Sequence, residues 1–177
     1  MGLFVTNLYL GYAALGLQIA TIALLAVFVV RARFETFTKL ATIVGRWGLW
    51  LGFAAALFAA LANQYYNQVL EIPPCDLCWW GRIFLYPQII LLGMAAWKRD
   101  SYMAEYSIVL SVIGAGISLY HHFLQMFPDS LPCPATGVSC AQRFLFEFGY
   151  ITYPLMAFSL FAFLIIVMLF VRARRGM

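Results

Sequence analysis

The segment ITYPLMAFSLFAFLIIVMLFV, residues 151–171, contains no charged side chain, and Arg172, Arg174 and Arg175 follow it. The hydrocarbon core of a bilayer is about 30 Å thick, so a helix needs about 20 apolar residues to cross it. A run of this length and composition is typical of a transmembrane helix. The three arginines mark the point at which the helix would leave the membrane.

Four further tracts have the same character. They extend over about residues 8–30, 40–63, 79–97 and 106–127. The whole chain of 177 residues is 64% hydrophobic and only 10% charged, which is too little polar surface to cover a soluble globule. The tracts also lack the alternation of polar and apolar residues that barrel strands require. The sequence therefore predicts an all-α membrane protein with five transmembrane helices.

Lysine and arginine are distributed unevenly among the segments that connect these tracts. Nine of the eleven fall in residues 31–46, 98–99 and 172–175, which would share one side of the membrane. Basic residues beside membrane helices are retained in the cytoplasm, so this pattern predicts an N-terminus outside and a C-terminus inside. The apolar neighbours of these residues favour membrane anchoring, not nucleic-acid binding, as the role of the net charge of +4.

The chain shows no linker, low-complexity tract or internal repeat. We therefore expect a single integral membrane domain over residues 1–177. The first tract is too long for the apolar part of a signal peptide and has no basic start, so we expect it to be a retained helix. Asp, Glu and Lys are absent from the middle of all five tracts, which argues against a transporter or channel.

All four cysteines lie in the two segments that we expect outside the membrane. Cys75 and Cys78 are separated by two residues, and Cys133 and Cys140 by six. Four cysteines in an oxidising compartment indicate two disulfides. Structural cross-links on short loops are one interpretation, and a zinc site with four thiolates is another, although the second spacing is unusual for zinc. A disulfide across two residues constrains the unfolded chain little, and strained exposed pairs are typically labile or catalytic.

Cys78 comes just before the third tract, which we expect to become helical at Trp79. The N–H groups and dipole at a helix N-terminus favour a thiolate there. Arg82 follows one turn deeper on the same face, where it can stabilise the thiolate and bind an oxygen-bearing ligand. An interfacial arginine without a catalytic role is the alternative. His121 and His122 point about 100° apart on the fourth tract, so at most one faces a given pocket.

The run PCDLCWWGRIFLYP, residues 74–87, resembles the signature of the bacterial DsbB/BdbC family of quinone-linked membrane proteins that generate disulfides. An arginine four residues after the second cysteine, here Arg82, is part of that signature. The run YHHFLQ at 120–125 and the run FGYITYP at 148–154 are similar to later segments of the family. The likeness covers about residues 40–171 in the same order.

The resemblance implies a four-helix core at residues 40–171 and an additional N-terminal helix at 8–30. It implies that Cys133 and Cys140 form the disulfide that a thioredoxin-like partner, similar to DsbA or BdbD, attacks with its thiol. The electrons would then pass to the disulfide of Cys75 and Cys78. The implied location is the bacterial cytoplasmic membrane, with the cysteines on the periplasmic or extracellular side.

The resemblance also implies a cofactor. Cys78 would pass the electrons to ubiquinone or menaquinone beside Arg82, and His121 matches the family's histidine near the quinone better than His122 does. The short loop between the second pair of cysteines is typical of the Gram-positive branch, and the additional helix has no counterpart in the family. A structural membrane protein with passive disulfides is the alternative function, and it predicts cysteines that do not exchange with a partner.

Overall fold

The computed structural model describes residues 2–31, 34–128 and 139–175. Five helices account for most of this part of the chain: α1 Gly2–Val30, α2 Glu35–Gln68, α3 Asp76–Lys98, α4 Met103–Met126 and α5 Tyr153–Arg175. All five are long and apolar enough to cross a membrane. The fold class predicted from the sequence, a helical membrane bundle with five spanning helices, is therefore confirmed, whereas its orientation stays a prediction.

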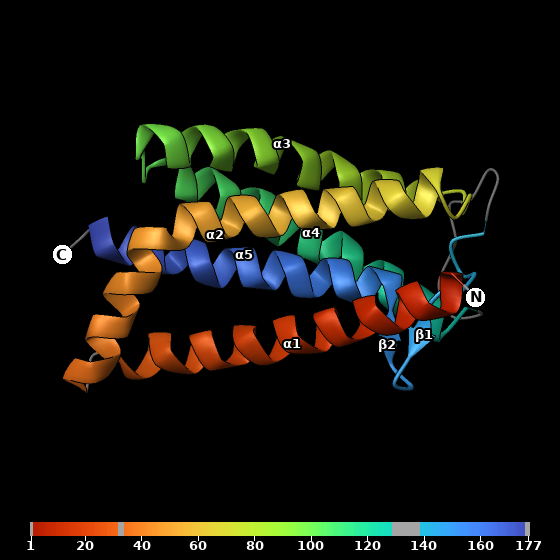
Figure 1. The fold of residues 1–177 in the computed structure, drawn as a ribbon, viewed down its shortest axis with the longest axis horizontal. Coiled ribbons are helices and arrows are strands. Elements are labelled where there is room, and N and C mark those ends of the chain that lie inside the picture. The colour runs from red at the N-terminus through yellow and green to blue at the C-terminus, as the bar shows by residue number, and fades with distance from the viewer. Residues whose placement is uncertain (1, 32–33, 129–138, 176–177) are drawn as a thin grey trace.

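Helices α2, α3, α4 and α5 form a bundle, and α1 lies along its outside against α5 (Figure 1). Consecutive helices run in opposite directions. We call the end of the bundle that holds Cys75, Cys78 and Cys140 the cysteine end, and the opposite end, where α3 stops at Lys98 and α5 at Arg175, the arginine end. The N-terminus lies at the cysteine end and the C-terminus at the arginine end (Figure 1).

Small residues and one polar cluster hold the helices of the bundle together. Gly114 of α4 lies so close to α5 that a Cβ atom there would be 2.5 Å from the ring of Phe161. Gln88, fully buried in α3, accepts hydrogen bonds from Ser107 and Ser111 of α4 at 2.8 and 3.1 Å. Close packing and interhelical hydrogen bonds stabilise helix pairs in lipid, where burial of apolar surface contributes little.

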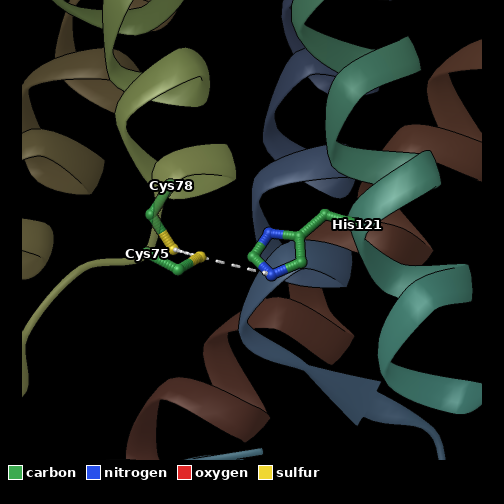
Figure 2. A group of neighbouring side chains, drawn as sticks. All are labelled: Cys75, Cys78 and His121. Carbon is green, nitrogen blue, oxygen red and sulfur yellow. Dashed lines mark hydrogen bonds between the residues drawn. The ribbon is translucent and has the colours of Figure 1, made fainter. Parts of the chain in front are cut away.

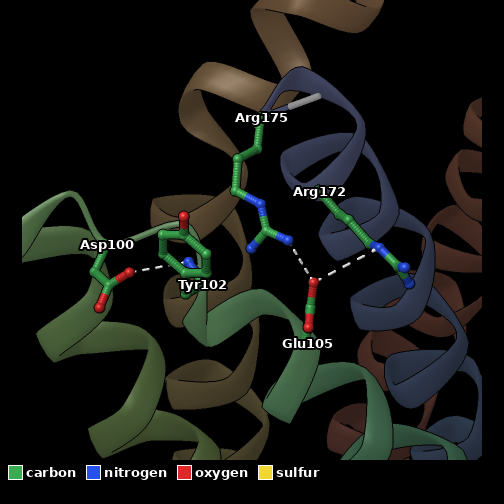
Figure 3. A network of polar contacts seen from close by, with 5 residues as sticks. All are labelled: Asp100, Tyr102, Glu105, Arg172 and Arg175. Atoms are coloured by element: carbon green, nitrogen blue, oxygen red, sulfur yellow. Dashed lines mark hydrogen bonds and ion pairs between the residues drawn. The ribbon is translucent and has the colours of Figure 1, made fainter. Parts of the chain in front are cut away.

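Charged residues tie α4 to α5 at the arginine end (Figure 3). Glu105 accepts a hydrogen bond from Arg175 at 2.6 Å and lies 3.8 Å from Arg172. The guanidinium of Arg175 also stacks on the ring of Tyr102 at 4.2 Å. These groups are partly exposed, so the ion pairs contribute little to stability and mainly fix the ends of the two helices.

Two features at the cysteine end differ from the sequence prediction. The last tract was expected to be helical from Ile151, but Ile151–Thr152 forms strand β2, which pairs with β1, Phe146–Glu147, in an antiparallel hairpin. The hairpin closes because Phe148 and Gly149 adopt positive φ angles of 53° and 77°, and such turn residues do not interrupt an apolar pattern. Helix α3 begins at Asp76, three residues earlier than predicted.

Candidate functional site

The Cys75–Cys78 pair forms the first turn of α3. Cys75 is the N-cap residue, and its carbonyl oxygen accepts hydrogen bonds from the backbone N–H groups of Cys78 and Trp79 at 3.1 and 3.2 Å. The preceding Pro73 and Pro74 keep the chain extended up to the helix start. One helical turn therefore brings the two sulfur atoms to 3.2 Å from each other (Figure 2). No disulfide bond, which measures about 2.05 Å, joins the two sulfurs at this distance.

The two sulfurs of this pair are not equivalent. The hydrogen bond with Cys78, followed by burial, raises the pKa of the Cys75 thiol to about 12. His121 acts in the opposite direction but more weakly. Cys75 therefore keeps its proton and can donate it to the sulfur of Cys78. Negative charge in the reduced pair is consequently carried by Cys78, which agrees with the role that the sequence predicts for it.

His121 of α4 connects the two segments that carry cysteines. Its Nε2 atom lies 3.7 Å from the sulfur of Cys75 (Figure 2). The same atom lies 3.0 Å from the carbonyl oxygen of Cys140. A carbonyl can only accept a hydrogen bond, so Nε2 carries the proton. The ring is buried, with 4% of its surface exposed. His122 instead pairs through Nδ1 with the hydroxyl of Thr152 at 2.8 Å, so His121 is the histidine that faces the cysteines.

Arg82 lies one turn below Cys78 and is buried, with 5% of its surface exposed. Its guanidinium carbon is 4.8 Å from the centre of the Trp79 ring. Within the described part of the chain, its Nε atom has no hydrogen-bond partner. A buried cation with an unsatisfied donor is costly in an apolar site, and an oxygen-bearing ligand would lower that cost. Burial distinguishes Arg82 from an arginine that only reaches the membrane surface.

Two neighbouring cavities meet at these side chains. Both are lined by Cys78, Arg82 and His121, and the outer one also by Cys75 and Cys140. The residues that the sequence interpretation missed come from other helices: Asn63 of α2 and Tyr153 of α5 line both cavities. Among the described residues, the Oδ1 atom of Asn63 is buried without a hydrogen-bond partner. An asparagine near the end of a predicted helix carries no signal in the sequence that would separate it from an interfacial residue.

The second cysteine pair is described in part. Cys133 lies outside the described residues, whereas Cys140 is buried, with 1% of its surface exposed, in an apolar cluster with Cys75 and Leu124. The structure thus brings Cys140 to the first pair across about 60 residues of sequence.

The described donor atoms do not form a site with four thiolates. Cys75, Cys78 and His121 offer three ligand atoms within 4.8 Å of one another, two sulfurs and one nitrogen. A structural zinc site usually has four protein ligands. The sequence favours no metal site, because the spacing of the second pair is unusual for zinc, and this expectation stays untested, since one of the four cysteines lies outside the described residues.

Comparison with known proteins gives one consistent result. The family model described as disulfide bond formation protein DsbB matches residues 45–171. Disulfide bond formation protein C of Bacillus subtilis is 33% identical over 131 residues, which is 72% of this chain and 94% of that protein. A probable disulfide formation protein of Coxiella burnetii is 36% identical over 117 residues, covering 64% of this chain and 80% of its own length. No solved structure matches the chain significantly.

Proposed function

The chain belongs to the DsbB family of disulfide bond formation proteins, and from this premise we propose that it is a thiol–disulfide oxidoreductase that reoxidises a thioredoxin-like partner and delivers the electrons to a membrane quinone. The observation that supports the proposal is the meeting of three groups at the cysteine end. These are the dithiol of Cys75 and Cys78, the buried Cys140, and the buried guanidinium of Arg82. Structural disulfides without a catalytic role need no buried cation beside them.

The exchange between the two cysteine pairs follows from their chemistry. A dithiol of the partner first reduces the disulfide of Cys133 and Cys140. The thiolate of Cys140 then attacks the sulfur of Cys75 in the oxidised first pair, so a Cys140–Cys75 bond forms, the Cys75–Cys78 bond breaks and Cys78 leaves as a thiolate. Attack of Cys133 on Cys140 restores the second disulfide and releases Cys75, which takes up a proton. Two electrons have then moved to the first pair.

The asymmetry of the first pair suits this direction of transfer. The raised pKa of Cys75, caused mainly by its hydrogen bond with Cys78, means that Cys75 is protonated once it is released. Cys78 then holds the electron pair next to Arg82, in the first turn of α3, where the helix dipole and the guanidinium both stabilise negative charge.

The side chains around Cys78 fit a quinone, which when bound supplies an acceptor for two electrons and two protons. Among the described residues, Arg82 offers an unsatisfied donor to a carbonyl oxygen of the quinone, and the unsatisfied Oδ1 atom of Asn63 would accept a hydrogen bond from a hydroxyl of the quinol. The two cavities, each of about 50 Å³, lie beside these side chains. Arg82, His121 and Asn63 are the residues that would hold the ring. Ubiquinone and menaquinone share this chemistry.

The location follows from the same proposal. The protein resides in the bacterial cytoplasmic membrane, with its cysteine end on the periplasmic or extracellular side. This placement puts the partner in the compartment in which exported proteins acquire disulfides. It also places the residues at the arginine end in the cytoplasm, as the distribution of basic residues predicts.

A coupled assay tests the proposed function. Purified protein is mixed with a reduced thioredoxin-like oxidase and a soluble ubiquinone or menaquinone analogue, and quinone absorbance is followed. We expect Cys78→Ser to abolish quinone reduction, because the thiolate beside Arg82 is lost. We expect Arg82→Gln to raise the KM for quinone about tenfold or more, which corresponds to the loss of a charged hydrogen bond.

Arg143→Gln is the matched control. Arg143 lies at the same end of the bundle but is exposed and stacks on Phe146 at 5.0 Å. We expect its KM for quinone to stay within twofold of the parent. Quinone reduction by the Cys78→Ser protein at the parental rate would refute the function, as would cysteines that stay inert to the reduced partner.

A further inference from the structure

Helix α1 lies outside the matched region, which begins at residue 45. Most of its surface is exposed and apolar, as expected of a helix in contact with lipid. Among the residues of α1 whose burial is described, 4–30, three are nevertheless buried, Asn7, Gly11 and Ala14, and all belong to the half of the helix at the cysteine end. Together with Gln18 they are spaced by four, three and four residues, which places them on one face of the helix.

The two amide side chains on this face each connect two other segments. Asn7 donates a hydrogen bond from Nδ2 to the carbonyl oxygen of Phe144 at 3.2 Å and accepts one from the hydroxyl of Tyr66 in α2. Gln18 donates to the hydroxyl of Ser159 in α5 at 3.0 Å and accepts from the hydroxyl of Tyr150 at 3.0 Å. In lipid, amide side chains are costly unless they are hydrogen-bonded, so the buried Asn7 and the half-buried Gln18 make this face specific for its neighbours.

Close packing accompanies these hydrogen bonds. A Cβ atom at Gly11 would lie 3.3 Å from Cβ of Glu147 and from the ring of Phe148, so α1 rests directly on the hairpin. The ring of Tyr12 meets that of Phe148 edge to face at 5.2 Å. The segment from Phe144 to Tyr150, which joins Cys140 to α5, is therefore attached to α1 along its length.

The residues just before this segment, 140–142, are held from the other side by α4, so the chain from 140 to 150, which we call the 140–150 segment, contacts both helices. The carbonyl of Cys140 faces His121, and the carbonyl of Gln142 accepts a hydrogen bond from Gln125 at 3.0 Å. Phe144, whose carbonyl oxygen accepts the hydrogen bond from Asn7, also lines the cavity that Cys75 and Cys140 line. Loss of the contacts to α1 would leave the segment attached at one side, and the position of Cys140 would be less restricted.

We propose that α1 is a docking helix that holds the 140–150 segment in place, so that Asn7 and Gly11 position Cys140 over Cys75 for exchange between the two cysteine pairs. This role rests on the proposed function, because positioning matters only if the pairs exchange. Asn7 touches neither sulfur and is a positioning residue. The helix thus limits the movement of a segment that would otherwise explore many arrangements.

The test measures proximity without quinone or partner. Cys78→Ser and Cys133→Ser together leave Cys75 and Cys140 as the only cysteines. The rate at which these two form a disulfide in a mild oxidant is followed by gel shift. We expect Asn7→Leu and Gly11→Leu in this protein to slow the reaction about tenfold, since each releases the segment from α1 by a different means. Tyr9→Leu, on the lipid-facing side of α1, is the control and leaves the rate unchanged; Tyr9 is 71% exposed.

Thermal unfolding of each variant separates positioning from folding. The proposal requires that Asn7→Leu or Gly11→Leu slow the cross-link while the folding transition is retained. Cross-linking within twofold of the parent in both variants would overturn it, as would slowing only where the folding transition is lost. The two outcomes can also separate. If the protein with only Cys75 and Cys140 cross-links as expected, but the protein with all four cysteines fails to reduce quinone, the proposed function is refuted and the docking role of α1 still stands.

Discussion

Two cysteines that are three residues apart differ in chemistry because they occupy different positions in the first turn of α3. Cys75 caps the helix and lies between Cys78 and His121, and Cys78 faces the cavity that Arg82 lines. In the reduced pair, the negative charge is therefore carried by one sulfur only, that of Cys78. The sequence spacing predicted this role for Cys78, but the retention of the proton by Cys75 depends on burial and on α4, which spacing does not reveal.

The pH dependence of alkylation tests this difference. With a pKa of about 12, only about one Cys75 in 10⁵ is ionised at pH 7. We expect the rate of Cys75 alkylation in the reduced protein to keep rising about tenfold per pH unit up to pH 10, without a plateau. In Cys78→Ser the thiol partner that contributes most to the raised pKa is gone, so Cys75 should react faster at pH 8. Peptide mass spectrometry gives both rates, and a plateau for Cys75 near pH 9 would contradict the assignment.

At the scale of helices and strands, close contacts between helices determine the positions of the residues that form the site. The approach of α4 to α5 at Gly114 sets the position of His121 two turns further along α4. The approximate extents of five helices could be predicted because apolar length is a local property of the sequence. The β1–β2 hairpin could not be predicted, since it depends on positive φ angles at Phe148 and Gly149 and on the hydrogen bond of Thr152 with His122, a contact that arises only in the assembled bundle.

A pair of glycines on α4 tests this packing. Gly114→Val places a branched side chain against the ring of Phe161, so we expect destabilisation of about 1–3 kcal/mol and weaker quinone reduction. Gly116 is the matched control, because a Cβ atom there meets nothing within 4 Å in the described structure. Thermal unfolding in detergent measures both variants. Equal transition temperatures for Gly114→Val and Gly116→Val would show that the α4–α5 contact is not tight.

For the whole molecule, the two ends of the bundle have different chemistry. One end gathers sulfur, imidazole and a buried guanidinium, and the other carries exposed arginines and Glu105. The sequence predicted which residues share an end, because helix order and length decide that. It did not predict Asn63, Tyr153 or Asn7 as neighbours of the site, since their proximity depends on how helices rotate and pack against one another.

The orientation of these ends in the membrane can be measured in intact cells. A fluorescent protein that folds only in the cytoplasm is fused after Met177, and an impermeant maleimide is added from outside after mild reduction. We expect both a fluorescent C-terminal fusion and labelling of the cysteines in the same intact cells, because the basic residues keep the arginine end in the cytoplasm and the cysteine end outside. Labelling only after the cells are permeabilised would reverse the proposed orientation.

The central claim is that the electrons leave the protein through the pair of Cys75 and Cys78. Fully reduced protein is mixed once with a quinone analogue in the absence of oxygen, quenched in acid, and the free thiols at each cysteine are mapped by mass spectrometry. The account predicts one quinol per protein at the earliest times, with loss of thiols at Cys75 and Cys78 before any loss at Cys133 and Cys140. Quinol formation at these earliest times, before the second pair can exchange with the first, while Cys75 and Cys78 remain thiols would contradict it.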